Sequence, residues 1–131
     1  MEVSALVEAI SAAENEYDWE RLGPLFSDQV TIVHPGLGPV VGRDANLAVI
    51  QFLVGAISGY HRATEHLVVE GDSGAFCFSI TGTHTGDLPG YPATGDPVEI
   101  TGAMFFQVSD GQMSYATEIL NHDSTRNLSL R

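Results

Sequence analysis

The sequence predicts an α+β fold in which N-terminal helices pack on a strongly curved, mainly antiparallel sheet and enclose a pocket. Two observations carry this prediction. Apolar residues recur at helical spacing in the first 58 residues, whereas from residue 61 to residue 121 they alternate with polar ones. A chain of 131 residues also suits one compact domain with one core, so residues 1–131 are expected to form a single unit.

Three helices are expected in the N-terminal part. Ser4 can cap a first helix over 4–16, because its hydroxyl can accept a hydrogen bond from a free backbone N–H of the first turn. Asp18 can cap a short second helix, which a Gly-Pro pair ends. A brief β-branched strand at 31–33 stops at another Pro-Gly pair, and a third, strongly apolar helix is expected over 43–58.

Four strands are expected after residue 59, joined as an antiparallel meander. They cover residues 61–70, 75–85, 98–108 and 112–121. The turn dipeptide Asp110-Gly111 connects the last two strands, and a loop over 86–97, rich in glycine and proline, is expected to cover the pocket. Strict alternation places these side chains of the last strand on one face: Met113, Tyr115, Thr117, Ile119 and Asn121.

Composition and charge exclude several classes of function. Acidic residues number 17 against five arginines and no lysine, for a net charge of −12, so nucleic acid and anionic membranes are not expected partners. Without lysine there is no Schiff-base chemistry. The single Cys77 excludes an internal disulfide, and its phenylalanine neighbours favour a buried thiol. The first residues lack a basic segment and no apolar stretch spans a bilayer, so a cytoplasmic protein is expected.

The C-terminal half resembles a known family. The segments ITGTHTG (80–86), PATG (92–95) and DGQM (110–113) follow one another as in the SnoaL-like polyketide cyclases of the nuclear-transport-factor-2-like (NTF2-like) superfamily. His34-Pro35 resembles a histidine or aspartate that often precedes a proline in that family. The resemblance covers most of the chain and implies an NTF2-like cone with a deep pocket between sheet and helices.

The resemblance also implies a type of chemistry. Members of the family close rings by intramolecular aldol reaction without a metal or organic cofactor, and their acid/base is an aspartate at the end of the last strand. The corresponding residue here is Asn121. An amide cannot transfer a proton at neutral pH, although it can hold a substrate oxygen by hydrogen bonds. Either another residue transfers the proton, or the chain performs different chemistry; no cofactor is expected.

Three residues can take over proton transfer. His84 lies in the best-matched motif on the face expected to point inward, and imidazole titrates near neutral pH. Asp123 follows Asn121 by two residues on the same face, and His34 ends the first strand at the expected pocket mouth. Each also has a structural interpretation. His84 can hold the 86–97 loop, and Asp123 can be a solvated acid. For His34 the functional and the structural interpretation are equally open.

Six further residues are expected to contact the ligand: Phe78, Met104 and Ile119 from the inward sheet face, Tyr91 from the covering loop, Tyr17 through its hydroxyl, and Asn121. Core packing is the alternative for Tyr17. No spacing of histidine, cysteine and carboxylate residues matches a metal-ligand pattern, so no metal site is expected.

The expected function is that of a cofactor-independent cyclase or isomerase. It would act by acid–base catalysis on a hydrophobic, carbonyl-bearing, polyketide-type small molecule in biosynthesis, as a lyase or isomerase. Alternatives are a hydratase, a dehydratase or an epoxide-opening enzyme on the same scaffold, and a non-catalytic small-molecule binder or accessory subunit. A titratable group inside the pocket distinguishes enzyme from binder. A homodimer is expected through a weakly charged outer sheet face that carries Ser79, Thr81, Thr101, Ala103 and Phe105.

Overall fold

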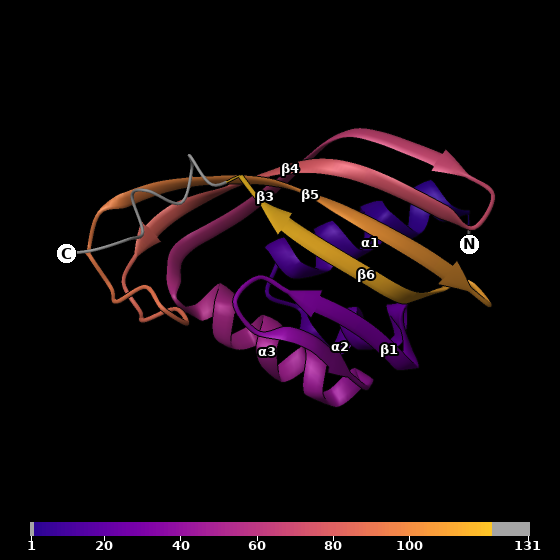
Figure 1. Cartoon of the computed structure of the whole chain (residues 1–131), viewed down its shortest axis with the longest axis horizontal. Helices are drawn as coiled ribbons and strands as arrows, with labels where there is room; N and C mark the ends of the chain where they lie inside the picture. The colour runs from indigo at the N-terminus through magenta and orange to yellow at the C-terminus, as the bar shows by residue number, and fades with distance from the viewer. Residues whose placement is uncertain (1, 122–131) are drawn as a thin grey trace.

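A single curved sheet covers the helices on one side only (Figure 1). The structure is a computed structural model that describes residues 2–121. Its elements in chain order are α1 (Val3–Asn15), α2 (Trp19–Leu22), the 3₁₀ turn η1 (Gly23–Leu25), β1 (Phe26–His34), β2 (Gly38–Val41), α3 (Arg43–Gly55), β3 (Ile57–Glu70), β4 (Ser73–His84), β5 (Pro97–Ser109) and β6 (Gln112–Leu120). The predicted α+β cone is therefore confirmed.

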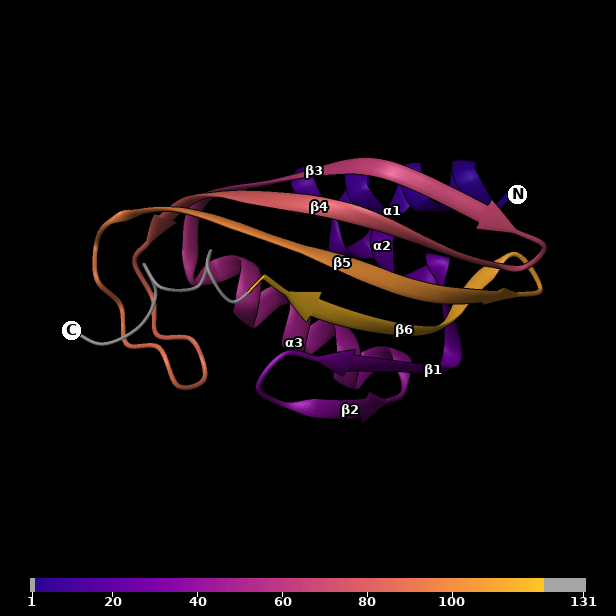
Figure 2. The ribbon, with the colours of Figure 1, turned by 45° about the horizontal axis from the view of Figure 1, so that its top comes forward.

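The strands follow the order β2-β1-β6-β5-β4-β3. Figure 2 shows this order from the face of the sheet that the helices do not cover. Strands β3 to β6 form the expected antiparallel meander. Strand β1 runs parallel to β6 and antiparallel to β2. Because Val33 pairs with Thr117, the next residues of the two strands, His34 and Glu118, stand beside each other at the same end of the sheet.

Two bulges bend the long strand β3 over helix α1. The register with β4 shifts between Ser58 and His61 and again between Glu65 and Val68. Gly59 and His66 lie in these shifts with positive φ angles of 70° and 53°. An extra residue in one strand increases local bending and changes which side chains point inward. Tyr60, within the first shift, and Arg62, just after it, both point to the interior.

A third bulge corrects the predicted faces of β6. Gln107 pairs with Tyr115 but Val108 pairs with Met113, so β6 contains one additional residue there. Met113 and Ala116 are consequently both buried, whereas Tyr115 is exposed. The prediction that Ile119 and Asn121 share the inward face of Met113 is wrong: Ile119 is 52% exposed and Asn121 is exposed. Glu118 points inward in their place.

Several element ends also differ from expectation. The first strand extends over nine residues rather than three, and its hairpin partner β2 was not predicted, because its Gly-Pro start is typical of a loop. Helix α3 ends at Gly55, since backbone pairing with His84 already places Ile57 in β3. Helix α1 is preceded by Glu2 rather than capped by Ser4, whereas Asp18 caps α2 by accepting from the Arg21 N–H as predicted.

The core lies between the inner sheet face and the apolar sides of α1 and α3. Phe76, Phe78 and Ile80 of β4 are buried, as alternation predicts. Cys77, between the two phenylalanines, points to the other face and is exposed, so the expected burial of its thiol is wrong. Within residues 2–121, no helix is long and apolar enough to cross a membrane.

Candidate functional site

A cavity of about 460 Å³ lies between the concave sheet face and helices α1 and α3. Most of its lining is apolar, and includes Ile10, Ile50, Val54, Ile100, Met104 and Leu120. A cavity of this size suits a small organic molecule, and its few polar groups would fix how that molecule lies. Those polar groups are the side chains of Ser11, Glu14, His34, Tyr60, Arg62 and Glu118.

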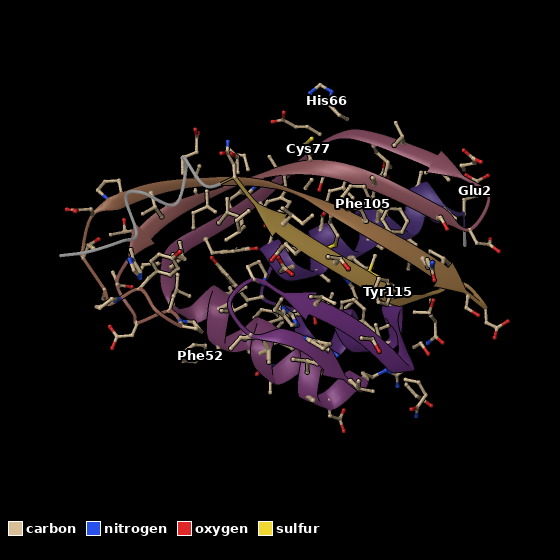
Figure 3. All side chains as sticks on the ribbon, in the orientation of Figure 1. Glu2, Phe52, His66, Cys77, Phe105 and Tyr115 are labelled. Carbon is tan, nitrogen blue, oxygen red and sulfur yellow. The ribbon has the colours of Figure 1, made fainter. Side chains whose placement is uncertain are left out.

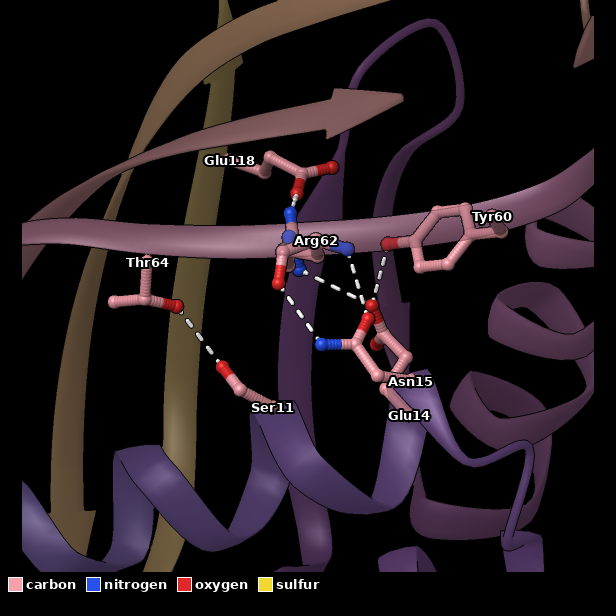
Figure 4. A network of polar contacts seen from close by, with 7 residues as sticks. All are labelled: Ser11, Glu14, Asn15, Tyr60, Arg62, Thr64 and Glu118. Atoms are coloured by element: carbon pink, nitrogen blue, oxygen red, sulfur yellow. Dashed lines mark hydrogen bonds and ion pairs between the residues drawn. The ribbon is translucent and has the colours of Figure 1, made fainter. Parts of the chain in front are cut away.

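Arg62 is the centre of a buried charged network (Figure 4). Its guanidinium pairs with Glu118 of β6 through Nη2 and lies 3.5 Å from Oε2 of Glu14 on α1 through Nη1. The hydroxyl of Tyr60, on β3 like Arg62, donates to the same oxygen of Glu14 at 2.5 Å. Three elements distant in sequence therefore meet at one polar cluster, which we call the Arg62 network: Glu14, Tyr60, Arg62 and Glu118.

Backbone contacts hold Arg62 in position. The side chain of Asn15 accepts from the Arg62 N–H at 2.8 Å and donates to the Arg62 carbonyl at 2.9 Å. One turn earlier, the hydroxyl of Ser11 lies 2.9 Å from that of Thr64. The guanidinium carbon also stands 4.2 Å from the ring centre of Phe78, a favourable cation–π distance. Helix α1 and strand β3 are thus fastened together at the point where the charges lie.

The Arg62 network contains more negative than positive charge. Two carboxylates face one guanidinium, so one negative charge is in excess when all three groups are ionised. Burial opposes the charge of Arg62, but the acidic groups around it raise its pKa, and it stays protonated. Burial raises the pKa of Tyr60 well above 10.0; Glu14 and Glu118 raise it too and Arg62 opposes them, so its hydroxyl remains a donor.

His34 also lines the cavity. It is 4% exposed, ends β1, and contacts Oδ1 of Asn46 through Nε2 at 2.9 Å. Asn46 is fully buried in the first turn of α3. Two of the residues predicted to transfer a proton, His34 and His84, lie in the described part of the chain, and of these His34 lines the cavity.

The predicted covering loop does reach the cavity. Leu88, Pro89 and Tyr91 line it, as does Gly36 from the β1–β2 turn. Leu88 and Tyr91 exchange two backbone hydrogen bonds, of 2.9 and 2.8 Å, which close a tight turn. Gly90 in that turn has a φ of 78°, a conformation that favours glycine. The expected positions of Tyr91 and Met104 at the cavity agree with this arrangement.

Other predicted residues lie elsewhere. His84 is inward-facing but fully buried, it is not part of the cavity wall, and neither ring nitrogen has a hydrogen-bond partner within residues 2–121. The 86–97 loop is held by the backbone of His84, through Asp96 and Gly95, and not by its ring. Tyr17 is 48% exposed and donates to the Tyr60 carbonyl.

The other side chains predicted to contact the ligand also lie differently from expectation. Phe78 packs under Arg62 rather than on the cavity. Ile119 is among the residues that line the cavity, but the β6 bulge leaves it 52% exposed. The same bulge turns Asn121 to the outer surface, and Asp123 lies outside the described residues.

Sequence reasoning missed the Arg62 network, although one signal was available. Glu14 lies seven residues after Val7 and four after Ile10, on the apolar stripe of the first helix. A carboxylate on such a stripe must have a buried partner. Glu118 carried no comparable signal, because its inward direction depends on the bulge. Across residues 2–121, no group of three histidine, cysteine or carboxylate side chains is placed to hold a metal ion.

Comparisons with known proteins agree with this fold. IdmH from Streptomyces antibioticus, a proposed polyketide cyclase, is 26% identical with a TM-score of 0.79, over 92% of this chain and 93% of that one. A proposed polyketide cyclase from Pseudomonas putida KT2440 is 21% identical with a TM-score of 0.83, over 99% of both chains. A ketosteroid isomerase-like protein from Catenulispora acidiphila, in complex with trimethylamine, is 19% identical with a TM-score of 0.75, over 95% and 91%.

The sequence itself supplies the family. No curated protein matches this sequence. The SnoaL-like domain family, in contrast, matches residues 7–116, which include Glu14, Tyr60 and Arg62 and both strands of the β3–β4 hairpin. This stretch is most of the chain, and the resemblance noted in the sequence is confirmed. The chain belongs to the SnoaL-like domain family.

Proposed function

We propose that this protein is a cyclase or isomerase that moves a proton on a hydrophobic, carbonyl-bearing small molecule. The observation that carries the proposal is the Arg62 network at the wall of an apolar cavity. Charges are costly to bury unless they are paired, and clusters of perturbed titratable groups in a cavity are typical of catalytic sites. The presence of titratable groups in the cavity favours an enzyme over the non-catalytic binder considered from the sequence.

Glu118 is the residue we assign to proton transfer. It is on the last strand, where the family has its acid/base, but three positions before Asn121 and on the inward face. Its side chain is 14% exposed compared with 6% for Glu14, so it is the more accessible carboxylate. Arg62 binds its Oε1, and Oε2 has no hydrogen-bond partner within residues 2–121. That free oxygen can take a proton from the carbon beside a carbonyl and return it to another carbon.

The other members of the Arg62 network support this step. Removing the carbon-bound proton leaves an enolate, whose negative charge the nearby guanidinium of Arg62 stabilises at short range in an apolar cavity. Glu14 accepts from the Tyr60 hydroxyl and forms an ion pair with Arg62, so it orients the guanidinium rather than reacting. The apolar lining and the turn at Leu88–Tyr91 reduce the access of water to the enolate.

A second chemistry is open to the same groups. Each carboxylate uses one oxygen in the network, Oε2 of Glu14 and Oε1 of Glu118, and keeps the other. Two such oxygens beside one guanidinium could hold and activate a water molecule, which favours hydration, dehydration or epoxide opening as the alternative. The two chemistries differ in whether solvent oxygen enters the product.

The setting of the protein is also part of the proposal. We expect it to act in the cytoplasm, in the biosynthesis of polyketide-type specialised metabolites, without an organic cofactor. A homodimer through the outer sheet face remains the expected assembly. On that face Phe105 of β5 is 53% exposed and Tyr115 of β6 is 37% exposed (Figure 3). A sedimentation experiment at micromolar concentration that gives only a 14.0 kDa species would contradict the dimer.

The test is deuterium exchange at carbon. A panel of hydrophobic cyclic ketones is incubated with the protein in D₂O, and loss of the proton beside the carbonyl is followed by proton NMR. Glu118→Gln should slow exchange by about 10²–10⁴-fold, the usual effect of removing a general base. Glu99→Gln, the same change at an exposed site of β5, is the control and should leave the rate unchanged. Exchange that is equally fast in both variants would refute the assignment of Glu118.

A further inference from the structure

The hydrogen bonds of Asn46 determine which way its amide lies. Its Nδ2 is 2.8 Å from the Gly42 carbonyl, 2.9 Å from the Val40 carbonyl and 3.3 Å from the Val30 carbonyl. Three acceptors require the donor end of the amide, so the opposite orientation would set oxygen against oxygen. The acceptor end, Oδ1, must therefore be the atom that faces His34.

The orientation of Asn46 in turn determines the protonation of the His34 ring. Nε2 of His34 lies 2.9 Å from Oδ1 of Asn46. Oδ1 can only accept, so Nε2 must carry a hydrogen. A neutral imidazole has one N–H, and when Nε2 carries it, Nδ1 has a lone pair. The backbone carbonyls of Val30, Val40 and Gly42 thus fix the orientation of Asn46, and Asn46 fixes which nitrogen of His34 is protonated.

Nδ1 of His34 is available to a ligand. Its residue lines the cavity, and Nδ1 has no hydrogen-bond partner within residues 2–121. Among the described residues, the fully buried side-chain polar atoms without a partner are Nε of Arg62 and both ring nitrogens of His84. Nδ1 of His34 is not one of them, so a ligand in the cavity can reach it. His34 and Glu118 follow the paired residues Val33 and Thr117 of two parallel strands, and both line the cavity, so one ligand can contact both.

We propose that Asn46 locks His34 in the Nε2–H tautomer, so that Nδ1 accepts a hydrogen bond from a hydroxyl group of the ligand. Asn46 is a positioning residue, and His34 is the acceptor that selects enols, phenols or alcohols over their ethers. The inference deepens the proposed function, and rests on it in taking the ligand to occupy this cavity. It adds to the carbonyl chemistry of Glu118 a second recognition point for an O–H group.

The tautomer can be observed without any substrate. Protein labelled with ¹⁵N-histidine is studied by long-range proton–nitrogen correlation at pH 8, where a neutral ring gives separate signals for its protonated and unprotonated nitrogens. His34→Gln identifies the ring, because one set of signals disappears. We expect Nε2 of His34 to be protonated and Nδ1 unprotonated. The opposite tautomer, or a mixture of both, would overturn the inference.

Variants separate positioning from simple stability. Asn46→Ala should give a mixture of tautomers at His34, whereas Asn15→Ala, which removes another asparagine with two backbone bonds, should not. An unchanged His34 spectrum in folded Asn46→Ala would contradict the role of Asn46. If that variant does not fold, the wild-type spectrum still decides the tautomer.

A matched pair of probes tests the ligand class. 2-Naphthol and 2-methoxynaphthalene have the same ring system, but only the first can donate a hydrogen bond. Naphthol should move the Nδ1 signal of His34 towards its protonated position, and the methyl ether should not. A signal that naphthol leaves unchanged would overturn the acceptor role. None of these measurements needs turnover, so their failure leaves Glu118 untouched, while an active Glu118→Gln would refute the proposed function and leave the tautomer standing.

Discussion

Removal of the Arg62 guanidinium should destabilise the fold far more than removal of another paired arginine. In Arg62→Met the aliphatic chain remains, but Glu14 and Glu118 lose their only cationic partner among the described residues. The side chains of the three residues are 9%, 6% and 14% exposed, so solvent compensates little of the lost charge. Breaking a buried ion pair by removing one partner costs about 3–5 kcal/mol. This is a large part of the roughly 5–15 kcal/mol that stabilises a typical domain.

Urea unfolding followed by circular dichroism measures this loss. Arg21→Met is the matched control, because Arg21 also pairs with two acids, Glu16 and Asp18, but is 47% exposed. Exposed pairs contribute about 0–1 kcal/mol. If Arg62→Met does not fold, Arg62→Lys keeps one charge but cannot span both carboxylates, and should give an intermediate loss. A loss below about 1 kcal/mol in Arg62→Met would refute the view that the network is a buried, mutually dependent unit.

Three further predictions address the alkaline limit, the covering turn and the sheet. Burial raises the pKa of Tyr60, so above about pH 10 the unfolded chain loses the phenol proton before the folded chain does, and the free energy of unfolding falls as the pH rises. Tyr60→Phe should flatten this fall, which urea midpoints between about pH 9 and 11.5 measure. Tyr91→Ala should weaken naphthol binding in NMR titrations with little change in melting temperature, and a large drop in melting temperature would instead make Tyr91 a core residue. Gly102→Ala should lower the free energy of unfolding by about 1–3 kcal/mol, because the added Cβ would lie 2.2 Å from the Ile119 carbonyl oxygen. Gly55→Ala is the control and should not destabilise the fold, because the space around Gly55 is open. Equal urea midpoints for the two variants would contradict this.

The general fold was predictable because it depends on repeated patterns. Alternation over residues 61–121 and the Asp110-Gly111 turn indicate the meander, and helical spacing before residue 58 indicates the helices. Both patterns average over many residues, so single irregularities do not hide them. Strand β2 escaped prediction because four residues that begin with Gly-Pro contain too little pattern to separate an edge strand from a loop.

The site was less predictable because it depends on single-residue shifts. One additional residue in β6 exchanges Ile119 and Asn121 for Glu118 on the inward face, and nothing in the sequence around Ser114 marks that bulge. Likewise Tyr60 and Arg62 meet Glu14 only because Gly59 shifts the register of β3. The position of His34 at the cavity was predictable because Pro35 fixes the strand end in the sequence itself. His84 had the correct face, but depth within the core cannot be judged from alternation alone.

The most direct test compares the carboxylate that the structure presents with the position that the family resemblance indicated. In the same deuterium-exchange assay, the pH–rate profile is measured for Glu118→Gln and for Asn121→Asp. Glu118→Gln should lose about 10²–10⁴ in rate, and Asn121→Asp should leave the profile unchanged, because residue 121 is on the outer surface. An altered profile in Asn121→Asp, together with full activity in Glu118→Gln, would place proton transfer at residue 121 and contradict the account.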